Sequence, residues 1–229
     1  MSEEYLLKAL NKSDSIRKLV CRRRTESLLL ERYKVLSYYL SGQIVISYLS
    51  GYSCDSVNLN DHGIDHKNLL LNYQADSCVV KGILDYINNP EVYYALPEND
   101  KKKSNYIAHR VASIIVGGPV ALAIYKNGYE AIKKKSKVVL EKPDLEIINE
   151  IQYFLAKEKQ LIIPDFSEKL ISYTLDLFHP QVWTAVESLA RKLTKTQYQF
   201  KLNRKLIENN LYKSGLISYK ESIRMINCD

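Results

Sequence analysis

The sequence predicts a mostly α-helical protein, and three observations lead to that prediction. The chain of 229 residues contains 8 Gly and 6 Pro, which is few for a turn-rich β architecture. Hydrophobic residues make up 46% and charged residues 26%, a balance typical of a folded globular chain. Apolar residues recur at helical spacing, most regularly in the C-terminal third. We therefore expect an irregular multi-helix domain with an extended loop excursion around residues 52–78.

The first half of the chain has helical spacing that is interrupted. We expect a short helix over residues 3–10 and an amphipathic helix over residues 16–40, which continues to residue 51 after a break at Gly42. Residues 52–78 are rich in Asp, Asn, Ser and His, a composition typical of a structured loop. Helical spacing then resumes until Pro90.

The apolar stretch Val111–Tyr125 is predicted to contain two buried helix segments that meet at a sharp break. The break is expected at Gly117-Gly118-Pro119, because proline fits the first turn of a second helix. The stretch is shorter than a membrane-spanning helix and is interrupted by these residues, so we expect a soluble protein.

The C-terminal third contains four segments with helical start signals and apolar spacing. The first starts at Pro143-Asp144, and the fourth runs over residues 196–212 and ends before Gly215. The predicted core residues are Leu145, Ile148, Ile151 and Leu155 in the first segment, Phe166, Leu170, Ile171 and Phe178 in the second, and Val182, Val186, Leu189 and Leu193 in the third.

The end of the chain has two readings. Ser218 and Glu221 form a capping box that starts a last short helix, which could belong to a DNA-reading helix-turn-helix. A recognition helix must be long enough to lie in the major groove, and this one is too short. Ile223, Met225 and Ile226 also need a core to pack against. We interpret this segment as a clasp that closes a larger fold.

Charge and cysteine usage set expectations for domains and location. The charged connection at residues 97–105 separates an N-terminal part, 1–95, from a C-terminal part, 104–229, although the two could form one continuous domain. The N-terminus has no apolar signal-peptide core, and the four cysteines form no CxxC pair. We therefore expect a cytoplasmic protein with reduced thiols.

No catalytic motif is present in the sequence. It contains no Walker-type nucleotide loop, GxSxG elbow or HExxH helix. A two-metal site needs closely spaced carboxylates, and the nearest candidates, Asp55, Asp61 and Asp65, lie in the loop excursion without an evident scaffold. A non-catalytic role is therefore favoured, with no cofactor expected, and an enzymatic role stays open.

The loop excursion contains one set of candidate metal ligands. Cys54, His62, His66 and Cys78 lie within a short segment, so four zinc ligands could converge, and such a zinc would be structural because the protein fills all four positions. The order and spacing match no standard zinc module, and Gly63 weakens a helix that would align the two histidines. We favour ordinary polar loop residues over a zinc site.

Basic residues cluster at several points, and the net charge is +7 with a pI near 9.0. This balance favours nucleic acid, an anionic surface or an acidic protein as a partner. Arginine suits bidentate phosphate contacts, so the N-terminal cluster is the stronger candidate, whereas a lysine run is more often a solvated face. The candidate nucleic-acid-binding residues are Arg17, Lys18, Arg22, Arg23 and Arg24 near the N-terminus, and Lys133, Lys134 and Lys135 farther along.

Three segments carry a family resemblance: "VLSYYLSGQIVISYLSG" (Val35–Gly51), "IQYFLAKEKQLIIPDFSEKLISYTLDLFHPQVW" (Ile151–Trp183) and "KLNRKLIENNLYKSGLISYKESIRMI" (Lys201–Ile226). They resemble the N-terminal domain of the archaeal and eukaryotic DNA primase large subunit. Together they cover about a third of the chain. The sequence departs from the family in an extra segment between Trp183 and Lys201, in residues 52–105, and in lacking the family's cysteine-rich iron–sulfur domain.

The resemblance implies a helical, non-catalytic scaffold that docks a catalytic primase subunit and contacts template or primer phosphates. The residues expected to dock the partner are Trp183, Leu202, Leu206, Leu216 and Ile223. Two alternatives stay open: a stand-alone regulator or structural protein of viral or mobile-element type whose C-terminal helices dimerise, and a metal-dependent enzyme built on the cysteines and histidines of the loop excursion. No membrane partner is expected.

Overall fold

A computed structural model of the chain describes residues 30–59, 73–74, 89, 91, 94–134, 138–159, 165–195 and 201–216. The chain divides into two compact units, Met1–Leu36 and Ser37–Asp229. Residues 30–36 are the described part of the first unit, and they are helical. All features discussed below belong to the second unit. The charged connection at residues 97–105 also lies inside this unit.

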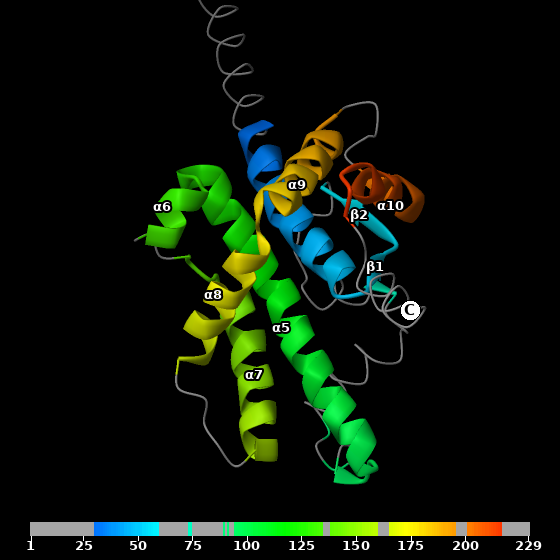
Figure 1. Ribbon diagram of the computed structural model, residues 1–229, viewed down its shortest axis with the longest axis vertical. Helices are drawn as coiled ribbons and strands as arrows, with labels where there is room; N and C mark the ends of the chain where they lie inside the picture. Colours follow the sequence, from blue (N-terminus) through cyan, green and yellow to red (C-terminus); the bar gives the residue numbers. More distant parts are fainter. Residues whose placement is uncertain are drawn as a thin grey trace, which may run out of the picture. The chain divides into compact units, whose positions relative to one another are not determined.

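The described part of the second unit is mostly helical, which confirms the predicted fold class. It opens with helical residues 37–49, named here the 37–49 helix. The helices that follow are α5 (Glu98–Asn127), α6 (Tyr129–Lys134), α7 (Lys142–Lys159), α8 (Phe166–Leu177), α9 (Pro180–Leu193) and α10 (Arg204–Lys213). Figure 1 shows α5 between α7 and α8 on one side and the 37–49 helix on the other.

The core forms where the 37–49 helix crosses α5. Residues 39–47 and 111–121 are buried on all sides, so neither helix has a solvent face at the crossing. Gly42 and Gly117 make this close approach possible. A Cβ added to Gly42 would lie 2.3 Å from the carbonyl oxygen of Gly117 and 2.4 Å from the Cβ of Ala121. The two backbones are therefore in contact.

Both predicted helix breaks are wrong. The 37–49 helix passes through Gly42, and α5 continues through Gly117, Gly118 and Pro119 as one helix. The glycines allow the two helices to pack closely, and this packing does not require a break in either helix. Pro119 lacks an N–H and leaves the carbonyl of Ile115 without its helical donor. The Nε2 of Gln43 donates to that oxygen across the crossing, at 3.5 Å.

The predicted loop excursion contains short strands, which the sequence reading missed. The strands are β1 (Ser53–Cys54), β2 (Ser56–Asn58) and β3 (Tyr73–Gln74), and β1 pairs antiparallel with β3. β2 pairs antiparallel with β4 (Lys201–Asn203), and Val57 lies opposite Leu202 in that pair. Because β4 occupies residues expected to be helical, α10 begins at Arg204 instead.

Local signals explain several helix ends. Pro180 starts α9 at its first turn, where a missing N–H costs nothing. Asn203 caps α10, since its Oδ1 accepts a hydrogen bond from the backbone N–H of Leu206 at 3.0 Å. Gly128, with a φ of 82°, separates α5 from α6, and Gly215, with a φ of 76°, follows α10.

The predicted apolar faces of the C-terminal helices are largely confirmed. All four core residues expected in α9 are fully buried, as are Ile148, Ile151 and Leu155 in α7. In and next to α8, Phe166, Leu170 and Phe178 are buried, whereas Ile171 is only half-buried. Leu145 in α7 departs further from the prediction, with 41% of its surface exposed. Its neighbour Asp144 is buried instead, and its carboxylate accepts a hydrogen bond from the hydroxyl of Tyr39 at 2.7 Å.

The length and composition of α5 would allow it to cross a membrane, and among the described residues it is the one helix of that kind. Of its most apolar 18-residue window, 72% is buried inside the protein. A core helix of a soluble protein passes the same test, so this property is weak evidence for a membrane span.

Candidate functional site

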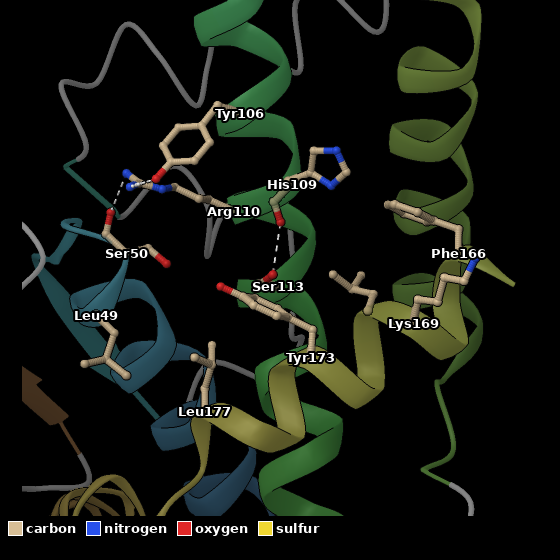
Figure 2. A pocket seen from close by; sticks show the side chains of 11 residues that line it. Leu49, Ser50, Tyr106, His109, Arg110, Ser113, Phe166, Lys169, Tyr173 and Leu177 are labelled. Carbon is tan, nitrogen blue, oxygen red and sulfur yellow. Dashed lines mark hydrogen bonds between the residues drawn. The ribbon is translucent and has the colours of Figure 1, made fainter. Parts of the chain in front are cut away.

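A pocket opens between the end of the 37–49 helix, α5 and α8 (Figure 2). Its volume is about 610 Å³, within the range of roughly 300–1,000 Å³ that ligand pockets occupy. Leucines from the 37–49 helix and α8 form an apolar floor, and polar and aromatic side chains surround it. The lining consists of Leu49, Ser50, Tyr106, His109, Arg110, Ser113, Phe166, Lys169, Leu170, Tyr173 and Leu177.

The α5 wall of the pocket is built around Arg110. One guanidinium nitrogen donates to the backbone carbonyl of Ser50 at 3.0 Å, and the other donates to the hydroxyl of Tyr106 at 2.6 Å. The guanidinium carbon also lies 4.1 Å from the centre of the Tyr106 ring. Ser50 directly follows the 37–49 helix, at the end where the helix dipole favours a positive charge. Arg110 is therefore held in place, with its charge at the pocket.

The α8 wall carries Phe166, Lys169 and Tyr173 on successive turns. Phe166 is buried, and its ring centre lies 5.9 Å from that of His109 on α5. Lys169 and Tyr173 are exposed, and Tyr173 keeps 59% of its surface accessible. Figure 2 shows Arg110 with Tyr106 on one side of the pocket and Phe166 with Lys169 on the other. Cationic and aromatic groups thus occur on both sides.

The pocket is electrostatically one-sided. Arg110, Lys169 and His109 contribute basic groups, and none of the described residues that line the pocket carries a carboxylate. Chemically, such a lining can bind an anion, and its rings can stack on a planar group. Among the described lining residues there is therefore no carboxylate that could act as a general base or bind a divalent cation.

Most of the predicted phosphate-binding residues cannot be placed against this pocket. Arg17, Lys18, Arg22, Arg23, Arg24 and Lys135 lie outside the described residues. Lys133 and Lys134 are exposed on α6, and the ammonium of Lys133 lies 5.8 Å from the centre of the Tyr129 ring. The lysine pair on α6 contributes no residue to the pocket lining.

The predicted metal ligands are likewise only partly described. His62, His66 and Cys78 lie outside the described residues, as do Asp61 and Asp65. Cys54 is buried, and its thiol donates a hydrogen bond to the backbone carbonyl of Ser56 at 3.4 Å. Burial raises the pKa of Cys54 to about 12, which favours the thiol over the thiolate that zinc needs. Asp55 lies 4.0 Å from the guanidinium of Arg204, where it serves as an ion-pair partner.

The predicted partner-docking residues differ in burial. Leu202 and Leu216 are buried in the protein's own core, so a partner could reach them only after a rearrangement. Trp183 and Leu206 are half-buried and keep side-chain surface for a contact. Ile223 lies outside the described residues, together with the rest of the predicted clasp.

Trp183 belongs to a stack of three aromatic rings. The ring of Tyr38 lies between Tyr125, with centroids 4.0 Å apart, and Trp183, with centroids 5.8 Å apart. Burial, followed by the negative charge of Glu187, raises the pKa of Tyr38. Tyr39, the next residue, is buried and packs against Gly118. Both tyrosines therefore serve packing within the protein.

The sequence predicted none of the pocket residues as a site residue, although Phe166 and Leu170 were expected in the core. The only local signal is an aromatic and a cationic residue four positions apart, Tyr106 with Arg110 and Lys169 with Tyr173. That spacing puts both side chains of a pair on the same helix face, but it is common in helices. Only the packing of α8 on α5 brings the two pairs to one pocket.

Comparisons of the chain with protein-family models, curated proteins and solved structures found no match. The functional argument therefore depends on the pocket and on the residues that form it.

Proposed function

We propose that this protein is a non-catalytic helical scaffold in nucleic-acid metabolism, similar in role to the N-terminal domain of a primase large subunit. In this proposal it contacts the phosphates of DNA or RNA and docks a catalytic partner subunit. Among the described residues, no observation particularly favours the alternative of a stand-alone dimeric regulator.

The pocket between α5 and α8 is the observation that carries this proposal. It combines three basic side chains with three aromatic rings, and its described lining has no carboxylate. Cations supply the attraction to phosphates, and aromatic rings supply a stacking surface that tolerates any base. The net charge of +7 adds a long-range attraction to polyanions.

The docking role rests on the resemblance of the segments around Trp183 and after Lys201. Trp183 lies at the start of α9, and Leu206 lies on α10, which packs against α9. Both side chains are half-buried, so each has surface that a partner could cover. Tryptophan is enriched among the residues that contribute most to protein–protein binding.

Two measurements test the proposal. Fluorescence anisotropy with labelled single-stranded and duplex DNA at about 50 and 200 mM salt should show binding that weakens steeply with salt, because released counterions drive phosphate contacts. Affinity purification of the tagged chain from its native cells should recover a primase-type catalytic subunit. Loss of that subunit from the Trp183→Ala/Leu206→Ala variant would support docking through this surface.

The two parts of the proposal can fail separately. Flat binding curves at both salt concentrations would contradict the nucleic-acid role. Recovery of no replication protein, together with a tight homodimer in light scattering, would contradict the docking role and favour the dimeric regulator.

A further inference from the structure

The two helices that flank the pocket each carry an aromatic and a cationic side chain one turn apart. On α5 the pair is Tyr106 and Arg110, and on α8 it is Lys169 and Tyr173. The α5 pair is closed on itself, because Arg110 covers the Tyr106 ring and bonds its hydroxyl. The α5 wall is thereby rigid before any ligand arrives.

The α8 pair differs from the α5 pair because its two side chains make no such contacts with the described residues, and we call this pair open. Within the described part of the chain, neither the ammonium of Lys169 nor the ring and hydroxyl of Tyr173 has a hydrogen-bonding, ion-pairing or stacking partner. The Tyr173 side chain is nevertheless placed at the pocket by its backbone on α8, with 59% of its surface accessible. An aromatic face and a cation are thus presented together, next to a positively charged wall.

We infer that the pocket binds an unpaired nucleotide of a single-stranded nucleic acid, with the base stacked on Tyr173 and a backbone phosphate at Lys169. This inference rests on the proposed function and narrows its substrate class. Paired bases are stacked inside a duplex and cannot reach a ring in a pocket, so the site selects single strands. Arg110 adds positive charge for a neighbouring phosphate, and the imidazole of His109 adds a polar group beside it.

Nucleotide chemistry accounts for both open groups at once. A phosphate forms an ion pair with the ammonium of Lys169, and a flat base of the same nucleotide unit stacks on the ring of Tyr173. An acidic peptide would use Lys169 and Arg110 but has no general need for an accessible aromatic face. A peptide ligand is therefore kept as an outcome of the test.

The experiment compares binding of a labelled single-stranded oligonucleotide with an abasic strand of equal length and charge. The parent protein should bind the intact strand more tightly. Tyr173→Ala should weaken that binding about five- to a hundredfold and remove the preference over the abasic strand. Tyr173→Phe should retain the preference, because it keeps the ring. Lys169→Gln should lower the slope of log affinity against log salt by about 0.7, the loss of one phosphate contact.

Matched controls come from the same molecule. Tyr153→Ala removes a ring that is 70% exposed on α7, outside the pocket lining, and Lys126→Gln removes an exposed charge at the end of α5. Both variants should keep the preference for the intact strand. Adenosine monophosphate should displace the strand at lower concentration than inorganic phosphate does, because only the nucleotide has a base.

The outcomes separate the inference from the proposed function. Salt-dependent binding with equal affinity for intact and abasic strands would overturn the inference and leave the nucleic-acid role standing. A parent protein that binds neither single strands nor duplex would overturn both. Displacement by poly-glutamate, with no effect of adenosine monophosphate, would overturn the inference in favour of an acidic peptide.

Discussion

Gln43 donates a side-chain hydrogen bond to the carbonyl of Ile115, which is the oxygen that Pro119 leaves without a helical donor. The donor comes from the 37–49 helix and the acceptor from the middle of α5. A proline inside a helix ordinarily bends or breaks it, at a cost of about 3 kcal/mol. Here, a neighbouring helix supplies a replacement donor, and α5 runs on for two more turns.

This relationship predicts coupling between Gln43 and Pro119. Gln43→Leu keeps a similar volume but leaves the Ile115 carbonyl buried without a donor, so it should lower the free energy of unfolding by about 1 kcal/mol. In the Pro119→Ala background, the N–H of residue 119 reaches that carbonyl, and the cost of Gln43→Leu should vanish. Urea unfolding of the four proteins of this double-mutant cycle measures the coupling. Equal costs in both backgrounds would contradict it.

The close approach of the two helices predicts that even a methyl group at Gly42 lowers the free energy of unfolding substantially. Gly42→Ala places a methyl group 2.3 Å from the carbonyl oxygen of Gly117, so the two central helices must separate. We expect a loss of about 1–3 kcal/mol or more in unfolding free energy. Gly128→Ala is the control, because a Cβ there meets nothing within 4 Å and only the positive φ opposes it. A loss at Gly42 no greater than at Gly128 would show that space is not limiting.

The hydrogen bond from Tyr39 to the buried carboxylate of Asp144 should stabilise the fold. Tyr39→Phe keeps the ring against Gly118 and removes the 2.7 Å bond, with an expected loss of about 1–3 kcal/mol, because a buried acceptor loses its donor. Tyr38→Phe, at a half-buried position on the same helix, should cost less. Guanidinium unfolding of both variants tests the difference, and equal losses would mean that the Asp144 contact adds nothing.

Cys54 should make stability fall at high pH. Its pKa rises to about 12 on folding because the thiol is buried, whereas in the unfolded chain it stays near 9.0. Between these values the unfolded state releases a proton that the folded state keeps, so the stabilisation is complete below pH 9 and is lost as the pH rises. From pH 8 to pH 10, the parent should lose about 1–1.5 kcal/mol more than Cys54→Ala. Parallel pH profiles would show that the thiol ionises normally in the folded state.

The sequence predicted best where structure depends on neighbours along the chain. The spacing of Val182, Val186, Leu189 and Leu193 fixes which face of α9 is apolar, and all four residues are buried. Pro180 determines where that helix starts, since its ring fits only the first turn. Helical class and much of the core follow from such local patterns.

Prediction failed where the outcome depends on a distant segment. Pro119 could end a helix or lie inside one, and the choice depends on Gln43, far away in the sequence. Residues 56–58 form a strand because residues 201–203 supply their partners, and neither segment is long enough to signal this alone. From the sequence alone, Asp144 is expected to be an exposed residue at a helix start. It is buried in the structure because the hydroxyl of Tyr39 donates a hydrogen bond to its carboxylate.

The sequence by itself therefore determined the helical class, the basic charge and the apolar faces of the C-terminal helices, because these depend on residue type and on spacing within a few turns. Only the tertiary structure decided that α5 is continuous, that β2 pairs with β4, and that two aromatic and cationic pairs on α5 and α8 meet at one pocket. Those features depend on contacts between segments that lie far apart in the chain, and no local spacing encodes which segments will meet.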